Sequence, residues 1–282
     1  MPLNAAHRKN FTFWWIFLFY LLATGKWMQG QWLYQHEPFM FSTRFDGVTW
    51  LFMQTGIHTW LLKSKALTII LDVLFYGLPL VFYAVFLKRP LTARWLPWLW
   101  LLVNWVYVQC YTLYPTNSIE AHIGWLLFPL LFCCNGMRSF YVVFHALRYF
   151  FLYFLFSAGI WKLAKGGAFL PTQMSAILME QHKDFLVTSP GYWQTDLIYS
   201  LIKMPITSFV LYWIGLIIEL CFVIGFFTRR YDRVLITLFI LFLVFDYLIM
   251  RIPYFEVAPF LLILLYSHFG MPEARLKEIG KP

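Results

Sequence analysis

The sequence predicts an all-α membrane protein, a polytopic bundle of about eight transmembrane helices. Hydrophobic residues make up 61% of the chain and charged residues only 12%, far from the composition of a soluble domain. The hydrophobic residues fall in runs long enough to cross a bilayer, which needs about 20 helical residues. Short basic segments separate several of these runs, as is typical of multi-pass proteins.

Eight apolar runs are the expected spans. The first has no small-residue cleavage site and continues into Lys26 and Trp27, so it is expected to remain as a span and not to be removed as a signal peptide. Such a bundle leaves no room for a soluble domain, and one transmembrane domain is expected over residues 1–282. The expected spans are residues 11–28, 67–87, 95–113, 120–135, 139–163, 207–227, 233–250 and 253–268.

The basic residues predict the orientation. With a cytoplasmic N-terminus, every short basic segment falls on the cytoplasmic side, so both termini are expected there. The two long loops, residues 29–66 and 164–206, are then outside. The net charge of +9 reflects this topology and contact with anionic lipid, and a nucleic-acid partner is not expected. The basic residues concerned are Arg8, Lys9, Lys88, Arg89, Arg94, Arg138, Arg229, Arg230, Arg233, Arg275, Lys277 and Lys281.

The two outer loops differ in character. Loop 29–66 mixes aromatic residues with few charges, as in a segment at the membrane interface, and its histidines His36 and His58 are expected to be interfacial. In the second loop, residues 173–186 have apolar side chains at helical spacing, which predicts an amphipathic helix. That helix is either a lid over the outer mouth or a surface helix covering the bundle, and both interpretations stay open.

Residues 139–167 give the strongest functional signal. This stretch is apolar and aromatic over a full span, but it has a cation near each end, Arg148 and Lys162. An ionisable group at the centre of a spanning helix costs about 2.5–3.5 kcal/mol, so it needs a reason. Lys162 either extends its stem to the lipid headgroups or serves a ligand, and both alternatives stay open.

Several polar residues are expected near Lys162. His122 opens the fourth expected span, which runs antiparallel to the fifth, so both residues lie near the outer face. Asp246, Arg251 and Glu256 lie where the seventh span ends and the eighth begins, at a similar depth. The sequence therefore predicts one outer-facing cluster of histidine, lysine and carboxylates.

Two further carboxylates, Glu219 and Asp72, lie within expected spans. Glu219 has apolar runs on both sides, and a group at that depth is neutralised by a proton or by a partner. Arg148 is the cation at a comparable inner depth, so we expect a structural Glu219–Arg148 ion pair, with proton handling as the alternative. Asp72 is close to Lys63 and Lys65, which predicts an exposed helix end or a local ion pair.

Common catalytic motifs are missing from the sequence. It contains no glycine-rich phosphate loop, nucleophile elbow or HExxH motif, and no internal repeat of the kind that transporters carry. The four cysteines lie in expected spans without metal-ligand spacing, so no metal site is expected and the cysteines are interpreted as packing residues. They are Cys110, Cys133, Cys134 and Cys221.

The string RYFFLYFLFSAGIWKL at residues 148–163 resembles the corresponding helix of the vitamin K-dependent gamma-carboxylase and its bacterial relatives, the horizontally transferred transmembrane (HTTM) family. The family pattern is an arginine, an apolar run with Tyr-Phe, a pair of small residues and Lys-Leu. Weaker matches are His122, Glu219 after GLII, and a basic loop before the last two helices, over roughly residues 100–265. The main pattern is matched by Arg148, Tyr153, Ala158, Gly159, Lys162 and Leu163.

The resemblance implies a site for a reduced, vitamin K-like quinone. Lys162 corresponds to the base that deprotonates the hydroquinone, and His122 to a histidine near the same site. A lysine desolvated among apolar walls can accept such a proton, and Trp161 and Tyr153 would supply walls for the flat ring. Asp246 follows a phenylalanine where the family often has histidine. The carboxylase's large lumenal region has no counterpart here, so carboxylation of a protein substrate is not expected.

The sequence thus predicts an integral protein of the cell membrane that binds a quinone or other prenyl lipid in an outer-facing pocket, with Lys162 as base. The alternative is a non-catalytic protein that binds a lipid or a soluble or membrane protein partner, its charges only holding the helices in register. A transporter is a third reading, weakened by the missing repeat. Whether the protein is an enzyme stays open.

Overall fold

The computed structural model describes residues 5–36, 46–88, 95–114, 124–134, 136–252 and 254–268. All regular elements in these ranges are helices, which confirms the all-α class. Among them, four helices are long and apolar enough to cross a membrane. These are α4 (Lys65–Lys88), α8 (Met137–Ala164), α11 with α12 (Pro205–Phe227), and α13 with the π-helical turn η4 (Asp246–Met250), together Asp232–Met250.

The other four expected spans coincide with helices that do not meet this combined measure of length and hydropathy. The first lies in α1 (Ala5–Met28) and the third in α5 (Leu96–Tyr111). The fourth and eighth correspond to shorter apolar helices at Gly124–Cys133 and Phe255–Leu265. Eight spans and cytoplasmic termini therefore stay predictions, while a membrane protein with several apolar helices is supported.

The chain divides into two compact units, described separately here. Unit 1 comprises Met1–His145 with Phe255–Leu262 and Phe269–Met271, and unit 2 comprises Ala146–Tyr254 with Ile263–His268 and Pro272–Pro282. Helix α8 begins in unit 1 and continues into unit 2. A single transmembrane domain over residues 1–282 stays a prediction.

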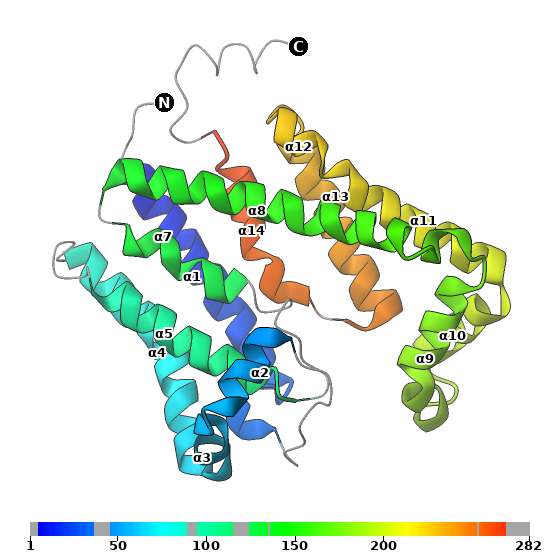
Figure 1. The fold of residues 1–282 in the computed structure, drawn as a ribbon, viewed down its shortest axis with the longest axis horizontal. Helices are drawn as coiled ribbons and strands as arrows, with labels where there is room; N and C mark the ends of the chain where they lie inside the picture. Colours follow the sequence, from blue (N-terminus) through cyan, green and yellow to red (C-terminus); the bar gives the residue numbers. More distant parts are fainter. Residues whose placement is uncertain are drawn as a thin grey trace. The chain divides into compact units, whose positions relative to one another are not determined.

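Unit 1 is built on α1, α4 and α5, of which α4 and α5 lie side by side (Figure 1). Aromatic rings fill its core. The ring of Trp15 lies 5.1 Å from that of Trp100 and 5.7 Å from that of Phe128, in the edge-on and offset contacts that aromatic rings favour. The smaller elements are η1 (Leu33–Gln35), α2 (Gly47–Gln54), α3 (Ile57–Lys63), α7 (Pro129–Cys133), η5 (Tyr254–Val257) and α14 (Pro259–Leu265).

The short helix α2 begins where its sequence provides a cap. The carboxylate of Asp46 accepts hydrogen bonds from the backbone N–H groups of Val48 and Thr49, at 2.8 and 3.0 Å. A side chain in this position satisfies N–H groups that have no partner within the helix. Loop 29–66 thus contains helices, and His58 is buried within it, while the interfacial position of the loop stays a prediction.

Asp72 corrects one expectation. Its side chain is only 1% exposed, and it accepts hydrogen bonds from the N–H groups of Leu33 and Tyr34 and from the hydroxyl of Tyr107, at 2.8–3.1 Å. The predicted exposed end or local pair with lysine is wrong, because α5 and the chain after α1 supply these donors. Asp72 therefore ties η1 and α5 to α4.

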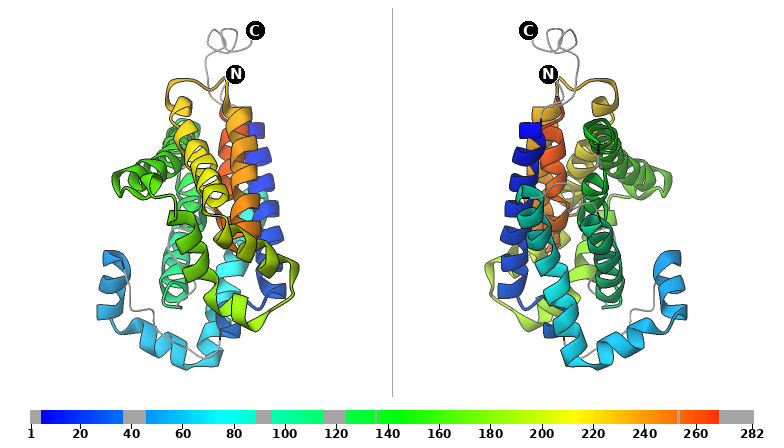
Figure 2. Two further views of the ribbon diagram at one scale, coloured as in Figure 1. Left: turned by 90° about the vertical axis from the view of Figure 1, so that its right-hand side faces the viewer. Right: turned by 90° about the vertical axis from the view of Figure 1, so that its left-hand side faces the viewer.

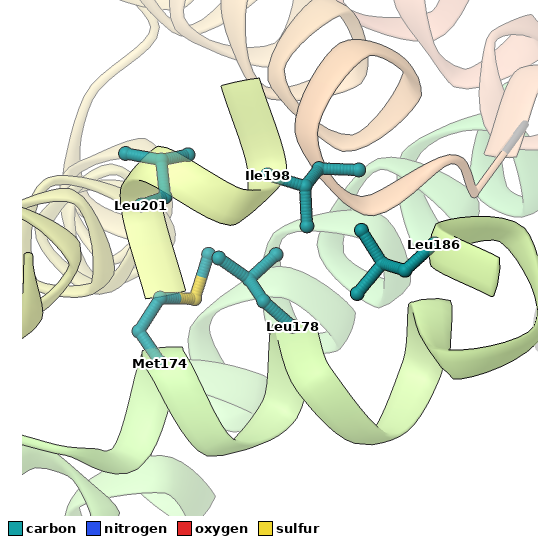
Figure 3. Packing of buried hydrophobic residues seen from close by; sticks show 5 residues of the cluster. All are labelled: Met174, Leu178, Leu186, Ile198 and Leu201. Carbon is teal, nitrogen blue, oxygen red and sulfur yellow. The ribbon is translucent and has the colours of Figure 1, made fainter. Parts of the chain in front are cut away.

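Unit 2 combines the rest of α8 with α11 and α13, which lie side by side in both views of Figure 2. Between α8 and α11 the chain forms η3 (Gly167–Phe169) and a helical hairpin, α9 (Gln173–Thr188) and α10 (Trp193–Lys203). The amphipathic helix predicted over residues 173–186 is confirmed as α9. Its apolar face packs on α10 and not only on the bundle. Figure 3 shows this hairpin core, made by Met174, Leu178, Leu186, Ile198 and Leu201.

Candidate functional site

The candidate site lies in unit 2, where α8 and α11 approach closely. Gly159 permits this approach, because a Cβ atom there would lie 3.0 Å from the side chain of Leu220 and 3.3 Å from the Cβ of Glu219. Lys162 follows on the same face of α8, since residues three apart are neighbours on a helix. A small residue at a helix contact in a membrane lets the backbones meet and brings the next side chains together.

Lys162 and Glu219 form an ion pair. The Lys162 Nζ donates a hydrogen bond of 2.6 Å to the Glu219 Oε1. The Glu219 side chain is 3% exposed, whereas that of Lys162 is 37% exposed. The Glu219 Oε2 is buried and accepts no hydrogen bond from any residue that the structure describes. The pair therefore keeps spare donors on the lysine and a spare acceptor on the glutamate.

Asp246 is the third member of this cluster. It lies at the junction of α13 (Asp232–Phe245) and the turn η4, it is buried, and its carboxyl interacts electrostatically with both Lys162 and Glu219. One cation thus interacts with two carboxylates, and the three groups lie in three helices that are each long and apolar enough to span a membrane. A single ammonium can neutralise one of them, so the other needs a proton or a further donor.

The α9–α10 hairpin holds the turn that carries Asp246. The side-chain amides of Gln181 and Gln194 donate to the carbonyls of Met250 and Leu248, at 2.8 and 3.3 Å. The His182 Nε2 lies 3.0 Å from the carbonyl oxygen of Ile249, which it must therefore serve as donor. Three consecutive carbonyls at the end of the π-helical turn are satisfied by side chains of the hairpin.

Arg251 and His182 also contribute to the contact between the hairpin and the turn η4. Arg251, which follows the turn, adopts the left-handed conformation with φ 53°, and its guanidinium lies 3.6 Å from the centre of the Phe185 ring. Burial lowers the pKa of His182 below its usual range; the Ile249 carbonyl opposes this, and the charge of Arg251 reinforces it. The sequence does not reveal this contact between the hairpin and the turn η4, because the acceptors are backbone carbonyls, which every residue carries.

The structure brings together only part of the predicted site. Lys162 and Asp246 belong to one cluster, with Glu219 as a member that had been assigned elsewhere. Trp161 and Tyr153 are 63% and 60% exposed, so they do not form walls buried beside the carboxylates. His122 lies outside the described residues. Glu256 belongs to unit 1, where it pairs with Lys26.

The predicted Arg148–Glu219 pair is wrong. The guanidinium of Arg148 binds both carboxylate oxygens of Asp232, at 2.5 and 3.2 Å, and also donates to the carbonyl of Gly225 at 3.0 Å. Lys162 lies 14 residues further along α8, about 21 Å at 1.5 Å per residue, and there it takes Glu219. Asp232 was overlooked because it stands among arginines in a loop interpreted only as basic.

No metal site accompanies these pairs in the ranges described: no group of three or more histidine, cysteine, aspartate or glutamate residues could hold an ion. The four cysteines form no disulfide, and Cys110 is buried in unit 1. What the candidate site offers is therefore an acid–base cluster of one amine and two carboxyl groups. When the chain is compared with known proteins, no protein family, no curated protein and no solved structure matches it.

Proposed function

We propose that this integral membrane protein binds the oxygen-bearing ring of a quinone or another prenyl lipid at the cluster of Lys162, Glu219 and Asp246. The observation that carries the proposal is the unequal exposure of the ion pair. The Lys162 ammonium is partly exposed, whereas the Glu219 carboxylate that binds it is buried. Such groups within membrane helices are costly and mark ligand or proton sites. The proposed site faces the outer side of the cell membrane, as the distribution of basic residues predicts.

The spare N–H groups of Lys162 suit a quinone oxygen. An ammonium has three donors and no acceptor, and one donor is used by Glu219. The resemblance of residues 148–163 to the HTTM family and the gamma-carboxylase supports a naphthoquinone ring as ligand. In the same proposal the exposed Trp161 and Tyr153 contact the prenyl chain.

The pair can also take a proton from a reduced ligand. Lys162 passes one proton to the ionised Glu219 and accepts one from the hydroquinone hydroxyl. The products are a hydroquinone anion beside the Lys162 ammonium and a neutral Glu219, so total charge is conserved and no electron acceptor is required. The Glu219 Oε2, which accepts no hydrogen bond from any described residue, is the acceptor for this proton. Asp246 supplies the second acceptor for the transferred proton.

Titration with a reduced naphthoquinone tests the proposal. We expect saturable quenching of tryptophan fluorescence in the purified, detergent-solubilised protein, to which Trp161 contributes because it adjoins Lys162 in sequence. Lys162→Ala should weaken binding about tenfold or more, since hydrogen bonds to charged groups contribute about 1.5–3 kcal/mol. Lys183→Ala, which removes an exposed lysine of α9, is the control and should bind like wild type. Unsaturable quenching of the wild type would end the quinone proposal.

The alternative is that the pair only holds α8 to α11, in a protein that binds lipid or a partner without catalysis. Its direct 2.6 Å contact and the burial of Glu219 favour this reading. Replacing both groups by apolar residues of similar size, Lys162→Met with Glu219→Leu, separates the two. Apolar replacement of a buried pair is often neutral or stabilising, so the double variant should fold. Loss of quinone binding in a folded double variant supports the site, and retained binding supports the structural role.

A further inference from the structure

A second charged cluster lies in unit 2, apart from the Lys162 site, around the short segment that joins α12 to α13. Three guanidinium groups, those of Arg148, Arg229 and Arg233, and one carboxylate, that of Asp232, act electrostatically on His268. Within the described part of unit 2, the local balance is therefore three positive charges against one negative. This excess lies between two helices that are apolar enough to span a membrane.

Asp232 pairs directly with Arg148, and its charge also acts on Arg229. Both of its oxygens are engaged by Arg148, whose remaining guanidinium nitrogen donates to the Gly225 carbonyl. The acceptors that Arg229 contacts are neutral, the backbone carbonyl of Ser267 and the hydroxyl of Tyr149. Burial, and then the charge of Arg148, lower the pKa of Arg229. Arg229 is thus a half-buried cation that would be stabilised by an anion from outside the chain.

Two polar atoms beside these arginines also lack a partner. The Oγ of Ser267, a residue with no exposed surface, and the Nδ1 of His268 are buried and form no hydrogen bond with any residue of the described ranges. Buried hydroxyl and imidazole groups are rarely left unsatisfied. A ligand with several acceptor oxygens would satisfy the hydroxyl and the guanidinium groups together.

The surroundings indicate how such a ligand is delivered. Phe227 is 86% exposed, and Tyr231 and Val234 are also exposed, so apolar side chains border the basic cluster. The segment joins the ends of Pro205–Phe227 and Asp232–Met250, which places it at a membrane surface if these helices span. By the distribution of basic residues this is the cytoplasmic surface, where anionic lipids gather.

We propose that Arg229 and Arg233, with the hydroxyl of Ser267, bind the phosphate of an anionic phospholipid, whose acyl chains lie against Phe227 and its neighbours. Arginine suits this role because its planar fork of donors matches phosphate oxygens. The site is distinct from the proposed quinone site and does not depend on it. Its bound lipid would stabilise the end of α13 at the membrane surface.

The experiment uses the full chain, purified and stripped of endogenous lipid in mild detergent. It is titrated with short-chain phosphatidylglycerol, with phosphatidylcholine of the same chain length and with inorganic phosphate, and binding is followed by native mass spectrometry and by melting temperature. We expect saturable binding of phosphatidylglycerol, a raised melting temperature, and at least about tenfold weaker binding of phosphatidylcholine. Equal affinity for inorganic phosphate would overturn the lipid proposal in favour of a free anion.

Matched variants assign the binding to residues. Arg229→Gln and the exposed Arg233→Gln should each weaken phosphatidylglycerol binding about tenfold. Arg230→Gln removes the same charge from an exposed position in the same segment, and should change binding by less than about twofold. If the Arg229→Gln variant does not fold, the phosphatidylglycerol affinity of the Arg233→Gln variant still tests the site. Equal losses in Arg230→Gln and Arg233→Gln would reduce the effect to general surface charge and refute the site.

Discussion

Arg148 and Lys162 show how two cations of one helix come to serve different ends. Arg148 is completely enclosed, and its three guanidinium nitrogens are all engaged by Asp232 and Gly225. Lys162 has one carboxylate partner and an accessible side chain. A fully satisfied buried charge stabilises structure, whereas a partly satisfied, accessible one can exchange partners. This difference is the physical reason for placing the ligand at Lys162.

Substitution of Arg148 should destabilise the protein strongly. Arg148→Gln leaves the Asp232 carboxylate buried without its cation, and breaking a buried pair in this way costs about 3–5 kcal/mol. Unfolding in mixed detergent micelles with increasing sodium dodecyl sulfate measures the loss. Arg138→Gln, an exposed arginine near the start of the same helix, is the control. Equal stabilities for the two variants would show that the Asp232 pair contributes nothing.

The sequence identifies these residues better than it identifies their partners. Lys162, Arg148 and Glu219 stand out because charges are rare in apolar helices. Counting residues to the nearest loop predicts the wrong pair, Arg148 with Glu219. The count indicates how deep a residue lies along its own helix, but not which faces of two helices meet. The contact at Gly159 decides the pairing, and it depends on the packing of α8 against α11. The exposure of Trp161 likewise depends on how α8 is rotated about its own axis, which the sequence does not indicate.

At the scale of elements, the α9–α10 hairpin acts on the site through the turn η4. Its own core of five apolar side chains holds the two helices together. Gln181, His182 and Gln194 then bind the carbonyls at the end of the turn that begins with Asp246. π-Helical turns occur often at functional sites. Movement of the hairpin would therefore shift a carboxylate of the proposed quinone site.

The hairpin should loosen in acid. The pKa of His182 is lowered by burial when the hairpin is docked, and returns toward its usual value near 6.5 when it opens. The open state therefore binds the proton more readily, so docking is most stable above about pH 6.5 and weakens as the pH falls below it. Hydrogen-exchange protection of residues 173–203 should drop between pH 7.5 and 5.5.

A variant separates this effect from general acid lability. His182→Gln keeps a side-chain N–H donor for the Ile249 carbonyl but removes the titrating group. In this variant the protection of residues 173–203, corrected for intrinsic exchange, should not depend on pH in that interval. The same pH dependence with and without the histidine would exclude His182 as its origin.

In unit 1, a glycine permits one close approach between elements. A Cβ atom at Gly124 would lie 2.5 Å from the backbone oxygen of Glu256, which cannot move without shifting η5. Gly124→Ala should therefore destabilise the protein by about 1–3 kcal/mol. Gly77→Ala, within α4 and with nothing within 4 Å, should instead stabilise it by about 0.5–1 kcal/mol. Thermal unfolding of the two variants checks both signs.

At the scale of the whole molecule, the sequence predicts the long helices well. Expected spans 67–87, 139–163, 207–227 and 233–250 each fall within one of the four apolar helices. Hydrophobic runs of this length leave the backbone little alternative to a helix in lipid. Helix α10 was not anticipated, because its apolar residues become informative only when paired with those of α9. Its amphipathic pattern follows the turn Ser189–Gly191, which ends α9.

Cytoplasmic placement of both termini is the topological prediction still to be checked. In bacterial inner membranes, a green fluorescent protein fused to the C-terminus should fluoresce, and an alkaline phosphatase fused there should be inactive. The same pattern is expected for N-terminal fusions, because the basic residues at each end favour the cytoplasmic side. Active phosphatase at the C-terminus alone would mean an odd number of spans, whereas an N-terminus outside the cell would place the proposed quinone site on the cytoplasmic side.

The aromatic core of unit 1 has an optical consequence. Trp15 and Trp100 are fully buried with ring centroids 5.1 Å apart and planes inclined at 62°, and Trp125 is buried in the same unit. Indoles this close share their excited states, so the folded protein should give a paired-sign band in ultraviolet circular dichroism. Trp15→Phe should remove the band and keep an aromatic ring in place. Folding of unit 1 can thus be watched in lipid, without a label.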